Sequence, residues 1–125
     1  MTRNEDLVYR LLCAADRPLS AYNILGGLRD EGFKAPLQVY RALGKLIDRG
    51  AVHRIESVNG FVACQLHDCG STAVSIFMLC ERCERADEFT DATIDARLQK
   101  LGNDRGFTAT RKVIEMTGLC PDCAK

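Results

Sequence analysis

Residues 51–64 have the sequence AVHRIESVNGFVAC, and their pattern is the strongest indication of how the first half of the chain folds. Its two short runs, 51–56 and 60–64, have the composition of β-strands. Val58, Asn59 and Gly60 supply the turn between them, and Asn-Gly is a strong hairpin signal. The residues before this stretch follow a helical period instead. We therefore expect a β-hairpin that comes directly after helices.

Three helices are expected ahead of the hairpin. The first covers about residues 4–15, the second runs from an N-cap at Ser20 to about Gly32, and the third runs from Pro36 to about Gly50. Three helices followed by a hairpin is the order of a winged helix-turn-helix domain. A small helical domain with a hairpin and no DNA-binding role is the alternative.

The third helix carries the side chains that favour DNA binding. Its apolar stripe comprises Val39, Leu43, Leu46 and Ile47. Gln38, Arg41 and Lys45 share the opposite face, and Tyr40 lies to one side. Basic side chains on an outward face can reach phosphates and guanine edges. A charged helix face that is merely solvated is the competing interpretation.

The second half is expected to be a separate small domain. We expect a winged-helix domain over 1–66, a hinge over 67–72 and an α/β domain over 73–125. The elements of the α/β domain are strands over 74–79, 87–89 and 107–117, with a helix from Thr90 or Asp91 to about Gly102 between the last two strands. A domain of about 53 residues buries too little surface to be stable alone. It therefore needs a metal, a partner subunit or both.

Four of the seven cysteines form two CxxC pairs, Cys80 with Cys83 and Cys120 with Cys123. Each pair follows a predicted strand, and two intervening residues let both thiolates face one ion. Four thiolates make the closed tetrahedral shell of a structural zinc ion. Redox-active CxxC motifs or disulfides are the alternatives. Reactive thiolates of such enzymes are found at helix N-termini, whereas these pairs follow strands.

The remaining candidate ligands surround the hinge. His53 and Cys64 lie on the hairpin strands, His67 and Cys69 lie in the hinge, and Asp87 and Glu88 lie in the second domain. A metal held by these parts would couple domain orientation to metal occupancy. The donor set suits Zn²⁺ better than Fe²⁺ or Mn²⁺. Taken one at a time, each of these residues is ordinary as a packing residue or as a solvent-facing residue. Cys64 and Cys69 could instead form a disulfide in a thiol sensor.

Charge and composition narrow the class of protein further. The chain has 17 basic and 17 acidic residues, which excludes a uniformly basic nucleic-acid coat. It has no apolar run of membrane-spanning length and no signal-peptide pattern at its start, so we expect a cytoplasmic protein. No catalytic triad, P-loop or dinucleotide motif is found, so we expect neither an enzyme nor a small-molecule substrate.

Four segments resemble the ferric uptake regulator family, most closely its zinc uptake regulator branch. They are APLQVYRAL at 35–43, VHRIE at 52–56, CERC at 80–83 and GLCPDC at 118–123. The resemblance implies a homodimeric, metal-responsive repressor whose winged helix binds an inverted-repeat operator and whose α/β domain dimerises. It also implies about two Zn²⁺ ions per subunit, one structural and one regulatory.

The resemblance assigns roles to individual residues. Cys80, Cys83, Cys120 and Cys123 match the structural zinc ligands, and Tyr40 and Arg41 match the DNA-contacting positions. His53, Cys64 and Glu88 match the sensing site. The family's fourth sensing ligand, a histidine, would fall near residues 71–72, and His67 or Cys69 could substitute for it. We expect a zinc-responsive repressor of zinc-uptake genes, with a thiol-, peroxide- or other-metal-responsive regulator as the alternative.

Overall fold

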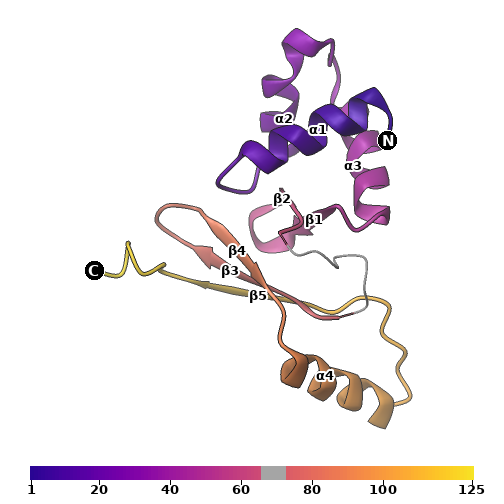
Figure 1. The fold of residues 1–125 in the computed structure, drawn as a ribbon, viewed down its shortest axis with the longest axis vertical. Coiled ribbons are helices and arrows are strands. Elements are labelled where there is room, and N and C mark those ends of the chain that lie inside the picture. The colour runs from indigo at the N-terminus through magenta and orange to yellow at the C-terminus, as the bar shows by residue number, and fades with distance from the viewer. Residues whose placement is uncertain (66–72) are drawn as a thin grey trace.

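The computed structural model describes residues 1–65 and 73–125, which form a helical unit and a small sheet joined through a hairpin (Figure 1). The first part contains α1 (Arg3–Ala14), α2 (Ala21–Gly27), the 3₁₀ turn η1 (Arg29–Glu31), α3 (Pro36–Asp48), β1 (Val52–Ile55), the 3₁₀ turn η2 (Glu56–Val58) and β2 (Gly60–Ala63). The second contains β3 (Ser75–Cys80), β4 (Ala86–Phe89), α4 (Ala92–Asp104) and β5 (Val113–Gly118). The predicted α+β class, a winged helix-turn-helix followed by a small α/β domain, is confirmed.

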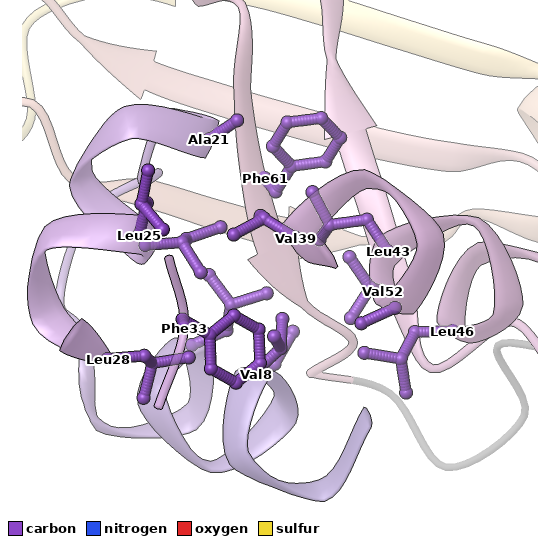
Figure 2. Packing of buried hydrophobic residues seen from close by; sticks show 14 residues of the cluster. Val8, Ala21, Leu25, Leu28, Phe33, Val39, Leu43, Leu46, Val52 and Phe61 are labelled. Carbon is purple, nitrogen blue, oxygen red and sulfur yellow. The ribbon is translucent and has the colours of Figure 1, made fainter. Parts of the chain in front are cut away.

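Short polar side chains and proline start the helices where the sequence predicts. The hydroxyl oxygen of Ser20 accepts the Asn23 N–H at 3.1 Å at the start of α2, and α3 begins at Pro36. The apolar faces of the helices then meet one another and the hairpin in one core (Figure 2). Its largest fully buried members are Val8, Ile24, Phe33, Val39, Leu43, Leu46 and Val52. This core holds α3 with its polar side outward.

The buried carboxylate of Glu5 ties the far end of α3 to α1. The Glu5 carboxylate, 7% exposed, lies 2.9 Å from Arg49 Nη1 and accepts the Thr2 hydroxyl at 2.8 Å. The hydrogen bond from Thr2 and the charge of Arg49 hold the pKa of Glu5 below its usual value, against the opposing effect of burial. The first turn of α1 is thereby tied to the residue that ends α3.

The hairpin turn differs from the predicted Asn-Gly turn. The strands pair from Val52 with Ala63 to Ile55 with Gly60, so η2 and Asn59 form the connection. Asn59 adopts the left-handed conformation, with φ at 48°. Gly60 lies in β2, where an added Cβ would meet Pro18 Cβ at 2.8 Å. Asn59 therefore supplies the left-handed backbone that the turn needs, and Gly60 leaves the space that Pro18 occupies.

The sheet has the order β4-β3-β5, with β3 antiparallel to β4 and parallel to β5. Helix α4 makes the crossover that a parallel pair requires. Phe77 pairs with Glu88 on one side and Glu115 on the other, so these side chains share one face. On that face Phe77 and Leu79 pack with Ile55 and Val62 of the hairpin.

Two predicted elements have clearly different bounds. The helix expected from Ser20 to about Gly32 ends at Gly27 and is followed by the separate 3₁₀ turn η1. The strand expected over 107–117 begins only at Val113, because Gly106 takes a left-handed conformation and residues 107–112 form the connection from α4. Across the described ranges, no helix combines the length and the apolar character that crossing a membrane would require.

Candidate metal centres and nucleic-acid interface

Four cysteine sulfurs converge where the ends of β3 and β5 lie side by side. Cys80, Cys83, Cys120 and Cys123 each offer a sulfur within 4.8 Å of the other three, and all four are free thiols. The Cys83 and Cys120 sulfurs are 3.8 Å apart. A tetrahedral shell with Zn–S bonds of about 2.3 Å has edges of about 3.8 Å, so the cluster matches the size of a zinc–thiolate centre.

Backbone groups prepare one of these thiols for ionisation. The N–H groups of Cys120 and Cys83 each lie 3.4 Å from the Cys80 sulfur and donate to it, which lowers the pKa of Cys80 to about 5. A hydrogen bond from Cys123 to Cys120 and burial raise the pKa of Cys123 to about 12. One sulfur thus carries the negative charge while a neighbour retains its proton, and a divalent cation is the species that would stabilise both as thiolates.

A second group of ligand atoms brings the hairpin to the sheet. His53 on β1, Cys64 just after β2 and Glu88 on β4 offer ligand atoms that all lie within 4.8 Å of one another. His53 Nε2 lies 3.1 Å from Glu88 Oε2. Their side chains are 16% and 0% exposed, so imidazole and carboxylate meet in a site largely closed to water. Imidazole, thiolate and carboxylate together are a donor set that binds zinc.

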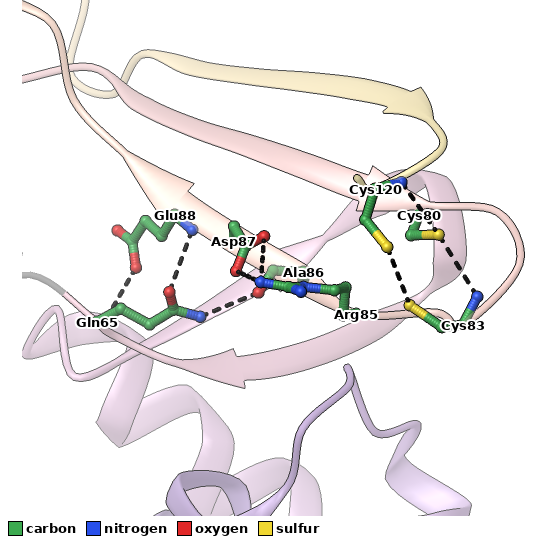
Figure 3. Close-up of polar contacts among 8 residues, drawn as sticks. All are labelled: Gln65, Cys80, Cys83, Arg85, Ala86, Asp87, Glu88 and Cys120. Atoms are coloured by element: carbon green, nitrogen blue, oxygen red, sulfur yellow. Dashed lines mark hydrogen bonds and ion pairs between the residues drawn. The ribbon is translucent and has the colours of Figure 1, made fainter. Parts of the chain in front are cut away.

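Gln65 holds this site together, and the sequence analysis did not identify it. Its backbone N–H donates to Glu88 Oε1 at 3.0 Å, and its side-chain Nε2 donates to the Ala86 carbonyl at 3.1 Å (Figure 3). Its side-chain Oε1 accepts the Glu88 N–H at 3.2 Å. The amide thereby pairs with β4 as a neighbouring strand would, next to Cys64. An isolated glutamine carries no sequence signal for this role.

The other predicted ligands of this site fall into three cases. Asp87 belongs to the opposite face of β4, and its carboxylate pairs with Arg85 at 3.1 Å, so it is not part of the group. His67 and Cys69 lie outside the described residues. Cys64 is disulfide-bonded in this structure. A sulfur in a disulfide is not a thiolate, so Cys64 can offer a zinc ligand only in the reduced protein.

The outer face of α3 presents most of the predicted DNA-contacting residues to solvent. Tyr40, Arg41 and Lys45 are exposed, while the apolar stripe on the opposite side is buried. Gln38 is engaged differently from the expectation. Its Oε1 accepts the backbone N–H groups of Lys34 and Ala35 at 2.6 and 3.0 Å, which caps the start of α3. The basic face available to a duplex is therefore formed by Arg41 and Lys45 beside Tyr40.

Comparison with known proteins adds an independent line of evidence. No family model matches the chain. The zinc uptake regulation protein of Escherichia coli (strain K12) is 37% identical over 119 residues, which cover 94% of this chain and 69% of that protein. A solved zinc uptake regulator complexed with zinc and DNA superposes with a TM-score of 0.91 at 36% identity, over 98% of this chain and 82% of that one. The crystal structure of holo XcZur gives a TM-score of 0.88 at 37% identity, over 98% and 85%.

The sequence identity and the superpositions extend over the helical unit, the hairpin and the sheet alike. The chain belongs to the ferric uptake regulator family, in its zinc uptake regulator branch.

Proposed function

We propose that this protein is a zinc-responsive repressor of zinc-uptake genes that binds an inverted-repeat operator as a homodimer. The observation that carries the proposal is the His53, Cys64 and Glu88 group, which draws on the hairpin and on the sheet. Relatives named for zinc uptake regulation, one of them solved with zinc and DNA, support it. Because its target is chromosomal DNA, we expect it to act in the cytoplasm.

We assign two zinc sites to each subunit. Cys80, Cys83, Cys120 and Cys123 would hold a structural ion that joins the end of β5 to the turn after β3. His53, Cys64 and Glu88 would hold the regulatory ion, with a fourth ligand from His67 or Cys69. Bound zinc supplies a positive charge that joins these donors. The protein's own contribution is to restrict how the hairpin, and with it α3, is oriented on the sheet.

The homodimer is supported by the outer face of the sheet. Met78, Phe89 and Met116 on this face are 46%, 45% and 53% exposed, and α4 has no buried residue in the single chain. Figure 1 shows α4 on the side of the sheet away from the helical unit. Apolar surface of this kind is typical of a subunit interface. A two-fold dimer would present two copies of α3 to successive major grooves.

Arg41→Ala tests the DNA-binding part of the proposal. We expect this variant to bind operator DNA weakly, at a cost of about 1–3 kcal/mol per lost base contact, because an exposed guanidinium on α3 is removed. The operator is first selected from a pool of random duplexes with zinc-loaded protein, and affinities are measured by fluorescence anisotropy. Arg10→Ala removes an exposed guanidinium from α1 instead of α3 and should bind as the wild type. Unchanged affinity of folded Arg41→Ala would remove Arg41 from the contact surface.

Thiol control of the same regulator is a second candidate, favoured by the disulfide-bonded state of Cys64. Oxidation of this sulfur would remove a ligand of the regulatory site and release the operator. The two signals are separated by measuring operator binding at fixed free zinc before and after peroxide treatment. Loss of binding that is reversed by a reductant supports thiol control, whereas unchanged binding leaves zinc as the only signal.

A further inference from the structure

The carboxylate of Glu115 on β5 accepts two hydrogen bonds from the backbone of the hairpin turn. Its Oε2 accepts the Glu56 N–H at 2.8 Å, and its Oε1 accepts the Ser57 N–H at 3.0 Å. Glu115 is 59 positions from Glu56 and 58 positions from Ser57 in the sequence, so this contact links the sheet to the hairpin. Hydrogen bonds that include an ionised group are about twice as strong as neutral ones. One carboxylate thus fixes two consecutive backbone groups at the start of η2.

The same row of the sheet carries the candidate zinc ligand. Glu88, Phe77 and Glu115 are directly paired across β4, β3 and β5. Each contacts the hairpin: Glu88 through His53 Nε2 at 3.1 Å, Phe77 through the His53 ring at a centroid distance of 5.5 Å, and Glu115 through the turn. The candidate metal site and the contact between Glu115 and the turn therefore lie at opposite ends of this row of paired residues.

We propose that Glu115 is a positioning residue for DNA binding, which holds the wing turn on the sheet so that closure of the regulatory site fixes the orientation of α3. The inference rests on the proposed function. Apart from Glu115, the hairpin is held on the sheet by His53 and by the apolar packing of Ile55 and Val62, and neither contact binds the backbone of the turn. Glu115 adds a directional contact at the turn itself, on the far side of Phe77, and α3 follows because Val52 of β1 packs in the same core as Leu46.

The chemistry of the contact explains why a carboxylate is needed. Both partners are N–H donors, and a carboxylate has two acceptor oxygens. An amide at this position has one acceptor oxygen and an NH₂ group that would face the second donor. Glu115→Gln therefore preserves size and removes one of the two hydrogen bonds together with the charge.

The test compares Glu115→Gln with Asp16→Asn, which neutralises an exposed carboxylate between α1 and α2, away from α3 and from the proposed subunit interface. Zinc content, zinc affinity and operator affinity are measured on each full-length protein under reducing conditions. We expect Glu115→Gln to bind both zinc ions as the wild type does and to bind the operator about tenfold more weakly at saturating zinc, because its binding-competent orientation is less populated. Asp16→Asn should match the wild type in all three measurements.

Amide hydrogen exchange of the zinc-loaded wild type keeps the inference testable if the variant folds poorly. The Glu56 and Ser57 amides should exchange slowly, and faster exchange confined to them is expected in Glu115→Gln. Exchange at unstructured rates in the wild type, or wild-type operator affinity in folded Glu115→Gln, would overturn the inference. A wild type whose operator binding ignores zinc would instead refute the proposed function, whatever Glu115 does.

Discussion

Cys120→Ser is expected to lose about one zinc ion per subunit, to unfold the sheet and to abolish operator binding. The structural reason is that the second domain has a small core, with Val74, Ile76, Phe77, Leu79 and Ala86 as buried apolar side chains. Neither α4 nor β5 contains a fully buried residue in the single chain. Without the sulfur of Cys120, the end of β5 is no longer joined to Cys80 and Cys83. We expect the melting temperature to fall by more than about 10 °C, as seen by circular dichroism.

Cys13→Ser is the matched control for this prediction. Cys13 is a free, exposed thiol on α1 and belongs to neither candidate metal group. The Cys13→Ser variant should keep wild-type zinc content, melting temperature and operator affinity. A folded Cys120→Ser protein with undiminished zinc content would contradict the assignment of the four-cysteine centre.

The same centre gives a dependence on pH. The backbone N–H of Arg85 acts to lower the pKa of Cys83, but burial and hydrogen bonds to Cys80 and Cys120 together outweigh it and raise this pKa. The pKa of Cys123 is raised to about 12. These thiols are protonated at neutral pH in the absence of metal, so zinc binding must release their protons. Zinc affinity should therefore fall as the pH is lowered, which competition with a chelator at several pH values can measure.

Glu88→Gln is expected to abolish zinc-activated operator binding while the structural zinc remains. The side chain of Glu88 is fully buried, and glutamine has the same shape and can keep the hydrogen bond from the Gln65 N–H. The fold should therefore persist, while the regulatory site loses its negative charge. We expect zinc affinity at this site to fall by at least about 100-fold, because even outer-shell partners of metal ligands are worth 10–100-fold.

Asp87→Asn controls for charge and for position on the strand. Asp87 precedes Glu88 on β4 but belongs to the opposite face, where it pairs with Arg85. Its neutralisation should leave zinc activation intact. If Glu88→Gln still bound the operator in a zinc-dependent way, the regulatory site would have to lie elsewhere.

The elements and the family could be predicted from the sequence because their signals are local. Ser20 and Pro36 mark helix starts, and the CxxC pairs bring two thiols within reach of one ion wherever they occur. The start of the last strand could not be predicted, because residues 107–112 have the composition of a strand but precede β5, although the Lys112 carbonyl already accepts the Ser75 N–H at 3.0 Å. Local composition contains no information about where strand pairing begins.

The contacts between the two parts of the chain could not be predicted for a related reason. Gln65 and Glu115 act through partners more than 20 and more than 50 residues away. Gln38 was expected on the DNA face from its helical phase, but its side chain caps α3 instead. The position of a residue in the helical repeat determines the direction of its Cα–Cβ bond. The hydrogen-bond donors nearby determine where the polar end of a long side chain lies.

We expect zinc in the His53, Cys64 and Glu88 site to turn on DNA binding. The most direct test measures zinc per subunit and operator affinity together, on reduced full-length protein, as free zinc is raised through a buffered series. We predict about two zinc ions per subunit, with operator binding appearing as the weaker site fills. About one zinc ion per subunit, with operator affinity unaffected by further zinc, would contradict the claim.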